Sequence, residues 1–81
     1  MTPARYFVFE RAGRWFVALD GTPLGRHPSR EAALKSAIVM ADLMGSMRHE
    51  ADVMVEADGE LDLAWTYGAD ALPLSLQGEA A

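Results

Sequence analysis

The sequence predicts an α+β domain in which two β-hairpins flank one amphipathic helix, in the order ββαββ. Two segments rich in aromatic and β-branched residues surround Gly13, and a second pair of such segments surrounds Asp58-Gly59. Between the two pairs, apolar residues recur at helical spacing. We therefore expect a four-stranded antiparallel sheet with the helix packed on one face. The 81 residues allow one domain, which we place at residues 1–67, followed by a flexible tail at 68–81.

The first predicted hairpin comprises Arg5 to Glu10 and Arg14 to Asp20. We expect a three-residue loop that ends at a left-handed Gly13, because this loop sets Phe9 opposite Trp15. In that register one face carries five apolar residues, namely Phe7, Phe9, Trp15, Val17 and Leu19. The other face is also apolar, with Tyr6, Val8, Phe16 and Ala18.

The helix is predicted to begin after Ser29, which suits the N-cap, with Glu31 in the first turn near the positive end of the helix dipole. The expected buried stripe contains Leu34, Ala37, Ile38, Ala41 and Met44. We expect Gly45 to end or weaken the helix in a left-handed conformation. The connector from Thr22 to His27 has room for a short additional edge strand.

The second hairpin comprises Asp52 to Glu56 and Glu60 to Tyr67. A two-residue Asp58-Gly59 turn would set Val55 against Asp62 and divide the apolar face. We therefore predict a three-residue loop that pairs Val55 with Leu61 and Val53 with Leu63.

One helix can cover one face of such a sheet, so the second apolar face of the first hairpin needs another cover. The candidates are the tail, through Leu72, Leu74 and Leu76, a second copy of the chain, or another protein. The helix also has a wide apolar arc, which includes Val39, Leu43 and Met47. We therefore expect a non-enzymatic protein-interaction module that forms a homodimer. The predicted interaction surface consists of Tyr6, Val8, Phe16, Val39 and Leu43.

Nucleic-acid binding is the alternative function, because aromatic side chains on a sheet can stack on unpaired bases. Its predicted contacts are Arg5, Arg14 and Phe16. The charge distribution disfavours it. The first 48 residues contain seven basic and four acidic residues, whereas the remaining 33 contain eight acidic and no basic ones. The second part of the chain would repel a phosphate backbone.

The sequence predicts no cofactor, no metal and no catalytic residue. It has no cysteine, which favours a cytoplasmic location, and no apolar run of the length that a membrane span needs. His27 and His49 lie at opposite ends of the predicted helix. Around Gly59 the spacing of acidic residues departs from a calcium-binding loop, because Met54 occupies the position of the first ligand. No serine lies in a Gly-x-Ser-x-Gly setting.

The order of three motifs resembles a small bacterial family known as domain of unknown function 2188. The motifs are Trp15-Phe-Val17, the helix start Ser29-Arg-Glu-Ala-Ala-Leu34, and the segment from Val53 to Leu63 around Asp58-Gly59. This resemblance implies a ββαββ-type domain without assigned activity. A second resemblance, to the N-terminal domain of HicB-type antitoxins, is carried by the same order of elements and by Asp20-Gly-Thr-Pro-Leu-Gly25. It implies an antitoxin-like regulatory role.

Overall fold

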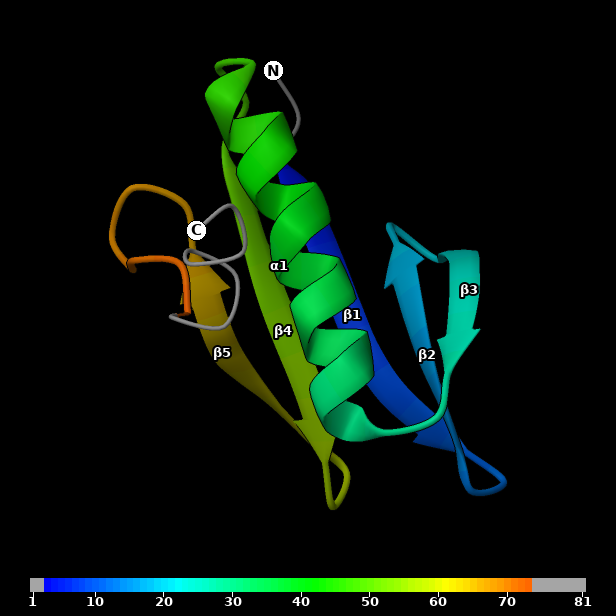
Figure 1. Ribbon diagram of the computed structural model, residues 1–81. Helices are drawn as coiled ribbons and strands as arrows, with labels where there is room; N and C mark the ends of the chain where they lie inside the picture. Colours follow the sequence, from blue (N-terminus) through cyan, green and yellow to red (C-terminus); the bar gives the residue numbers. More distant parts are fainter. Residues whose placement is uncertain (1–2, 74–81) are drawn as a thin grey trace.

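The computed structural model describes residues 3–73, which form a five-stranded sheet with one helix on one side (Figure 1). The elements are β1 (Ala4–Arg11), β2 (Arg14–Leu19), β3 (Thr22–His27), α1 (Arg30–Ser46), β4 (Ala51–Ala57) and β5 (Glu60–Thr66). The predicted α+β class, the single helix and both hairpins are confirmed for this part of the chain. The connector before the helix forms the edge strand β3.

The sheet is mixed, with the strand order β3-β2-β1-β4-β5. The prediction that the sheet is antiparallel throughout is wrong, because β1 pairs with β4 in parallel, from Ala4 beside Ala51 to Val8 beside Val55. After β3 the chain crosses the sheet as α1 and returns in the direction of β1, which is the connection that parallel neighbours require. Both hairpin turns, β1–β2 and β4–β5, consequently lie at the same end of the sheet (Figure 1).

Both hairpins have two-residue turns, so the predicted three-residue loops are wrong. Ala12 and Gly13 connect the pair Arg11–Arg14, and Asp58 and Gly59 connect Ala57–Glu60. All four turn residues have positive φ, between 53° and 81°, as a type I′ turn requires. In the first hairpin the shorter loop pairs Phe9 with Phe16 and Val8 with Val17.

The second hairpin follows the register that the sequence argument rejected. Val55 pairs with Asp62 and Met54 with Leu63, and then a bulge shifts the pairing so that Val53 lies opposite Trp65. The extra residue returns Trp65 to the face that the helix covers. The apolar pattern predicts a three-residue loop only for an uninterrupted ladder, and the bulge between Val53 and Met54 interrupts it.

The helix begins as predicted. The backbone N–H of Ala32 donates to Ser29 Oγ at 3.1 Å, and Glu31 lies in the first turn. The buried side of the helix consists of small residues and one isoleucine, which let it approach the sheet closely: Ala33, Ala37, Ile38, Ala41 and Gly45. The expectation for Gly45 is wrong, because Gly45 is helical and the left-handed residue that follows the helix is Arg48, with φ of 71°.

The core lies between α1 and the covered face of the sheet. Its sheet side comprises Tyr6, Val8, Val17, Val53, Val55 and Trp65, all at most 4% exposed. The chain after β5 adds to this core, since the Trp65 Nε1–H donates to the Ala71 carbonyl at 3.1 Å and Leu72 packs against the cluster. The rest of the predicted tail, with Leu74 and Leu76, lies outside the described residues. Within residues 3–73 there is no helix with the length and apolar character that crossing a bilayer requires.

Candidate functional site: the open face of the sheet

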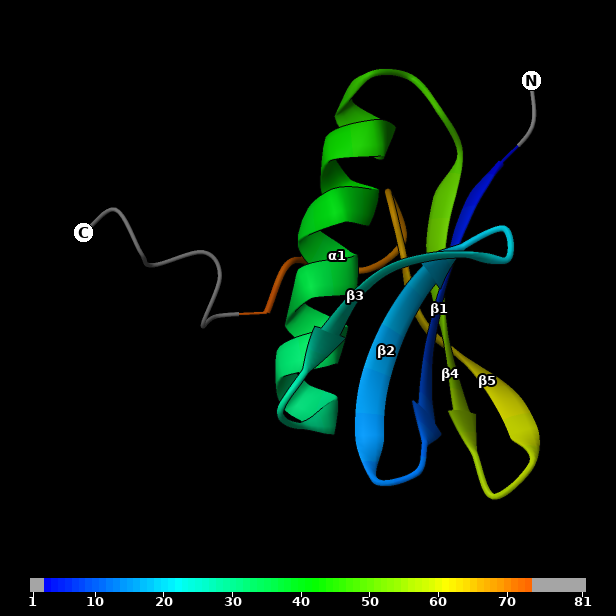
Figure 2. The ribbon, with the colours of Figure 1, turned by 90° about the vertical axis from the view of Figure 1, so that its right-hand side faces the viewer.

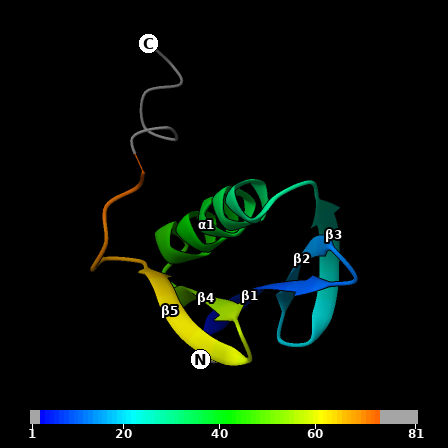
Figure 3. The ribbon, with the colours of Figure 1, turned by 90° about the horizontal axis from the view of Figure 1, so that it is seen from below.

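The candidate site is the side of the sheet that α1 leaves uncovered, which we call the open face. Figures 2 and 3 show α1 on one side of the strands and no described element against the other. Strand registers and alternation assign the side chains to each face. The apolar members of the open face, besides Ala18 and Pro23, are Phe7, Phe9, Phe16, Met54, Leu61 and Leu63. Its charged members are Arg5, Arg11, Arg14, Arg26, Asp52 and Glu56.

The aromatic side chains of the open face form one group on the two strands β1 and β2. The rings of Phe9 and Phe16 stack with their centroids 5.7 Å apart, and Phe7 lies two residues before Phe9 on the same face of β1. Beyond β4, Leu61 and Leu63 are 52% and 59% exposed. The apolar surface therefore extends across β2, β1, β4 and β5.

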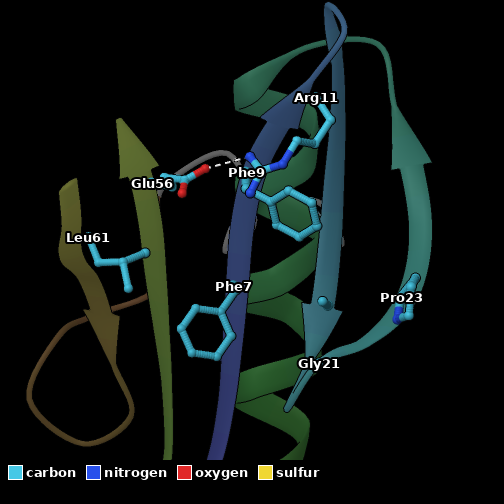
Figure 4. A pocket seen from close by; sticks show the side chains of 8 residues that line it. Phe7, Phe9, Arg11, Gly21, Pro23, Glu56 and Leu61 are labelled. Atoms are coloured by element: carbon cyan, nitrogen blue, oxygen red, sulfur yellow. Dashed lines mark hydrogen bonds and ion pairs between the residues drawn. The ribbon is translucent and has the colours of Figure 1, made fainter. Parts of the chain in front are cut away.

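An open groove of about 320 Å³ runs over this surface (Figure 4). Phe7, Phe9 and Leu61 line its floor together with Ala18, and Pro23 of β3 lines one side. Arg11 and Glu56 lie at one end of the groove. Most of the lining is apolar, so the groove is suited to apolar side chains of a binding partner.

Two ion pairs connect β1 to β4 on the open face. Arg5 binds Asp52 with two hydrogen bonds, from Nε to Oδ1 at 3.0 Å and from Nη2 to Oδ2 at 3.1 Å. The hydrogen bond and the charge of Asp52 raise the pKa of Arg5 above its ordinary value. Arg11 Nη1 donates to Glu56 Oε1 at 2.6 Å, and its guanidinium carbon lies 4.9 Å from the centroid of Phe9. Both pairs are solvent-exposed, so they contribute little to stability, but they compensate two of the four arginine charges of this face.

The predicted interaction surface is divided between three places. Tyr6 and Val8 are 3% and 0% exposed in the core beneath α1, so placing them on a free surface was wrong. Phe16 lies on the uncovered face, as expected. Val39 and Leu43 are exposed on α1, apart from Phe16.

The residues predicted to contact nucleic acid, in contrast to the predicted interaction surface, share one face. Arg5, Arg14 and Phe16 all lie on the open face. Sequence reasoning did not place Phe7, Phe9, Leu61 and Leu63 there. For Leu61 and Leu63 the signal that indicates it is Asp58-Gly59, which favours a two-residue turn and so turns both leucines away from the helix. For Phe7 and Phe9 the Ala12-Gly13 turn has the same effect, but alanine gives no such signal.

The described residues contain no group of three His, Cys, Asp or Glu side chains arranged to hold a metal ion. A second hollow, of about 430 Å³, lies near the two hairpin turns and is lined by Glu10, Trp15, Arg30, Glu56, Asp58 and Gly59. Neither hollow is lined by a serine or a histidine, so neither offers a hydroxyl nucleophile beside an imidazole base. Comparisons with models of protein families, with curated proteins and with solved structures gave no match.

Proposed function

We propose that this chain is a non-enzymatic protein-interaction module and that the open face is its interface. The observation that supports the proposal is the apolar surface that crosses four neighbouring strands and that nothing in residues 3–73 covers. Large contiguous apolar patches are uncommon on soluble monomers and mark sites of interaction. The sequence has no cysteine, and we place the module in the reducing cytoplasm.

A protein partner fits this face better than a nucleic acid does. The two carboxylates Asp52 and Glu56 lie on the face and bind the guanidinium groups of Arg5 and Arg11. A phosphate backbone would have to compete with these carboxylates for the same donors. Leu61 and Leu63 add aliphatic surface that cannot stack on bases but can pack against apolar side chains.

The test compares two lysine substitutions at equally exposed leucines. Leu63 on the open face and Leu43 on α1 are each 59% exposed, so Leu63→Lys and Leu43→Lys disturb the fold to a similar, small extent. Tagged wild type and both variants are recovered from the native cell, and bound proteins, including untagged copies of this chain, are identified by mass spectrometry.

We expect Leu63→Lys to abolish specific capture and Leu43→Lys to leave it unchanged, with circular dichroism verifying that both variants are folded. The opposite pattern would place the interface on α1, next to Val39. Equal capture by all three proteins would contradict an interface on the open face.

Single-stranded nucleic-acid binding is the second candidate function. It is favoured by one observation, the position of Arg5, Arg14 and the stacked rings of Phe9 and Phe16 on one face. Fluorescence anisotropy with labelled single strands and duplexes, repeated at increasing salt, tests it. The logarithm of the binding constant should fall linearly with the logarithm of the salt concentration, and binding should be lost in the variant Phe9→Ser. No change in anisotropy at low salt eliminates this candidate.

A further inference from the structure

We propose that the partner of the open face is an acidic protein segment, whose carboxylates bind Arg14 and Arg26 and whose apolar side chains occupy the groove beside them. This inference rests on the proposed function, since it gives the chemistry of the partner of the same surface. Three properties of the open face support it: its net charge, the position of its two uncompensated arginines, and the apolar character of the strands on the other side.

The open face is positively charged, whereas the chain as a whole has a net charge of −5. Four arginines lie on this face, and the ion pairs with Asp52 and Glu56 compensate two of them. Arg14 and Arg26 are exposed, and neither forms an ion pair within residues 3–73. The uncompensated charge of the face therefore favours a negatively charged partner.

The two uncompensated arginines lie beside Phe16. Arg26 is the neighbour of Phe16 on β3, and Arg14 lies two residues before Phe16 on the same face of β2. Asp20 follows the opposite end of β2 from Arg14. Two carboxylates of a partner can therefore bind both guanidinium groups while an adjacent apolar side chain packs on the Phe16 ring.

The other side of the face is apolar and has no cation of its own. β4 and β5 contain no Lys or Arg, and Leu61 and Leu63 are exposed on β5. Adjacent strands lie about 4.8 Å apart, so about 19 Å separate β3 from β5 across the sheet. A protein segment can carry carboxylates at one end of this span and apolar side chains at the other.

A nucleic acid has a phosphate at every nucleotide and would place some of them beside the carboxylates of Asp52 and Glu56 on β4. The groove next to Glu56 is lined by Phe7, Phe9 and Leu61, which suit apolar side chains (Figure 4). Charge at one side and apolar surface at the other therefore fit an acidic protein segment better than a polyanion of uniform charge.

Selection from a random library of displayed twelve-residue peptides on the immobilised chain tests the inference. Twelve residues reach about 18 Å even in a helix, so they can cross the face. We expect the peptides that bind wild type to be enriched in Asp and Glu at one end and in apolar residues at the other. The variant Arg14→Glu/Arg26→Glu reverses both charges and should select Lys and Arg in place of the acidic residues.

Fluorescence anisotropy with the most enriched peptide at physiological salt measures the size of the effect. Arg14→Glu/Arg26→Glu should raise its dissociation constant by about tenfold or more. A peptide with lysines in place of the acidic residues should bind this variant more tightly than it binds wild type. Lys35→Glu/Arg48→Glu makes the same change of charge on α1 and directly after it, and should leave the dissociation constant unchanged.

Three results overturn the inference: a library from which no peptide is enriched, enriched peptides without acidic residues, and unchanged affinity in Arg14→Glu/Arg26→Glu. Two other occupants are checked with the same variant. A labelled oligothymidine that binds wild type but not the variant would assign the arginines to nucleic acid. A dimer in sedimentation velocity that the variant dissociates would assign them to a second copy of this chain. Either result overturns the acidic segment.

These results are separable from a failure of the proposed function. Apolar peptides that bind wild type but not Leu63→Lys remove the acidic partner and retain the interface. Acidic peptides that bind Leu63→Lys as tightly as wild type place the binding site elsewhere and remove both.

Discussion

The contact between Gly45 and Tyr67 provides a sharp test of how the segment directly after β5 packs on the helix. A Cβ atom built on Gly45 would lie 2.1 Å from Tyr67 Cγ and 2.3 Å and 2.5 Å from the two Cδ atoms. Carbon atoms that are not bonded to each other approach to about 3.5–4.0 Å. Gly45→Ala therefore forces the Tyr67 ring away from the helix.

The expected loss in the free energy of unfolding follows from the contacts that the Tyr67 ring gives up. The rings of Trp65 and Tyr67 meet edge to face with centroids 6.3 Å apart, a contact worth about 0.5–1.5 kcal/mol. The apolar area of the ring that returns to water adds about 1–2 kcal/mol. Alanine in place of a helical glycine recovers about 1 kcal/mol of helix propensity. We expect a net loss of about 1–2 kcal/mol from the free energy of unfolding.

The assay is a double-mutant cycle of wild type, Gly45→Ala, Tyr67→Ala and the double variant, with urea and thermal unfolding followed by circular dichroism at one protein concentration. Without the Tyr67 ring, Gly45→Ala should stabilise the protein by about 1 kcal/mol, which corresponds to a rise in Tm of about 4–8 °C for a chain of this size. The coupling energy between the two positions should therefore be about 2–3 kcal/mol.

Additive effects of the two substitutions would contradict this contact between Gly45 and Tyr67. If Gly45→Ala has the same effect with and without the Tyr67 ring, the ring does not lie against Gly45 in solution. Gly45 would then serve only to weaken the helix end, as its sequence position alone indicates.

Three other substitutions test local features of the fold. Ser29→Ala removes the acceptor for the Ala32 N–H and should lower the free energy of unfolding in urea by about 1 kcal/mol; no loss would show that water replaces the cap. Ala12→Asn should raise Tm and increase the free energy of unfolding by up to about 1 kcal/mol, because Ala12 has a φ of 54° that asparagine tolerates better. A lower Tm would contradict the two-residue turn. Burial raises the pKa of the Tyr6 phenol above its ordinary value of 10.0, so this phenol ionises first in the unfolded chain. As the pH rises above that value, wild type should therefore lose stability relative to Tyr6→Phe, by at most about 1.4 kcal/mol per pH unit. A constant difference between these two proteins in urea melts across that range would show that Tyr6 titrates normally.

The first hairpin shows how far strand patterning predicts a fold. The sequence argument correctly placed Trp15 and Val17 towards the helix and Phe16 away from it. For β1 the prediction exchanges the two faces. A three-residue loop in place of the observed Ala12-Gly13 turn shifts the pairing by one residue and moves every β1 side chain to the opposite face. Tyr6 and Val8 are thus core residues, whereas Phe7 and Phe9 lie on the open face.

Two features lay beyond what the pattern could predict. The left-handed conformation of Ala12 has a steric cost, so nothing in its identity indicated a type I′ turn. The bulge between Val53 and Met54 adds a residue to the ladder and makes the Asp58-Gly59 turn compatible with a buried Trp65. The general expectation, one covered and one uncovered apolar face, agrees with the structure, because it depends on the number of helices and not on the register.

The parallel pairing of β1 and β4 also constrains when the sheet can form. β1 is the central strand and the first to leave the ribosome, yet its second neighbour arrives only after α1, with Arg5 and Asp52 separated by 47 positions in sequence. Until then, one long edge of the newly made ribbon presents unpaired backbone groups, a state that invites pairing with other chains. Closure over so long a segment slows folding, so a nascent chain of this protein remains aggregation-prone until β4 has been synthesised.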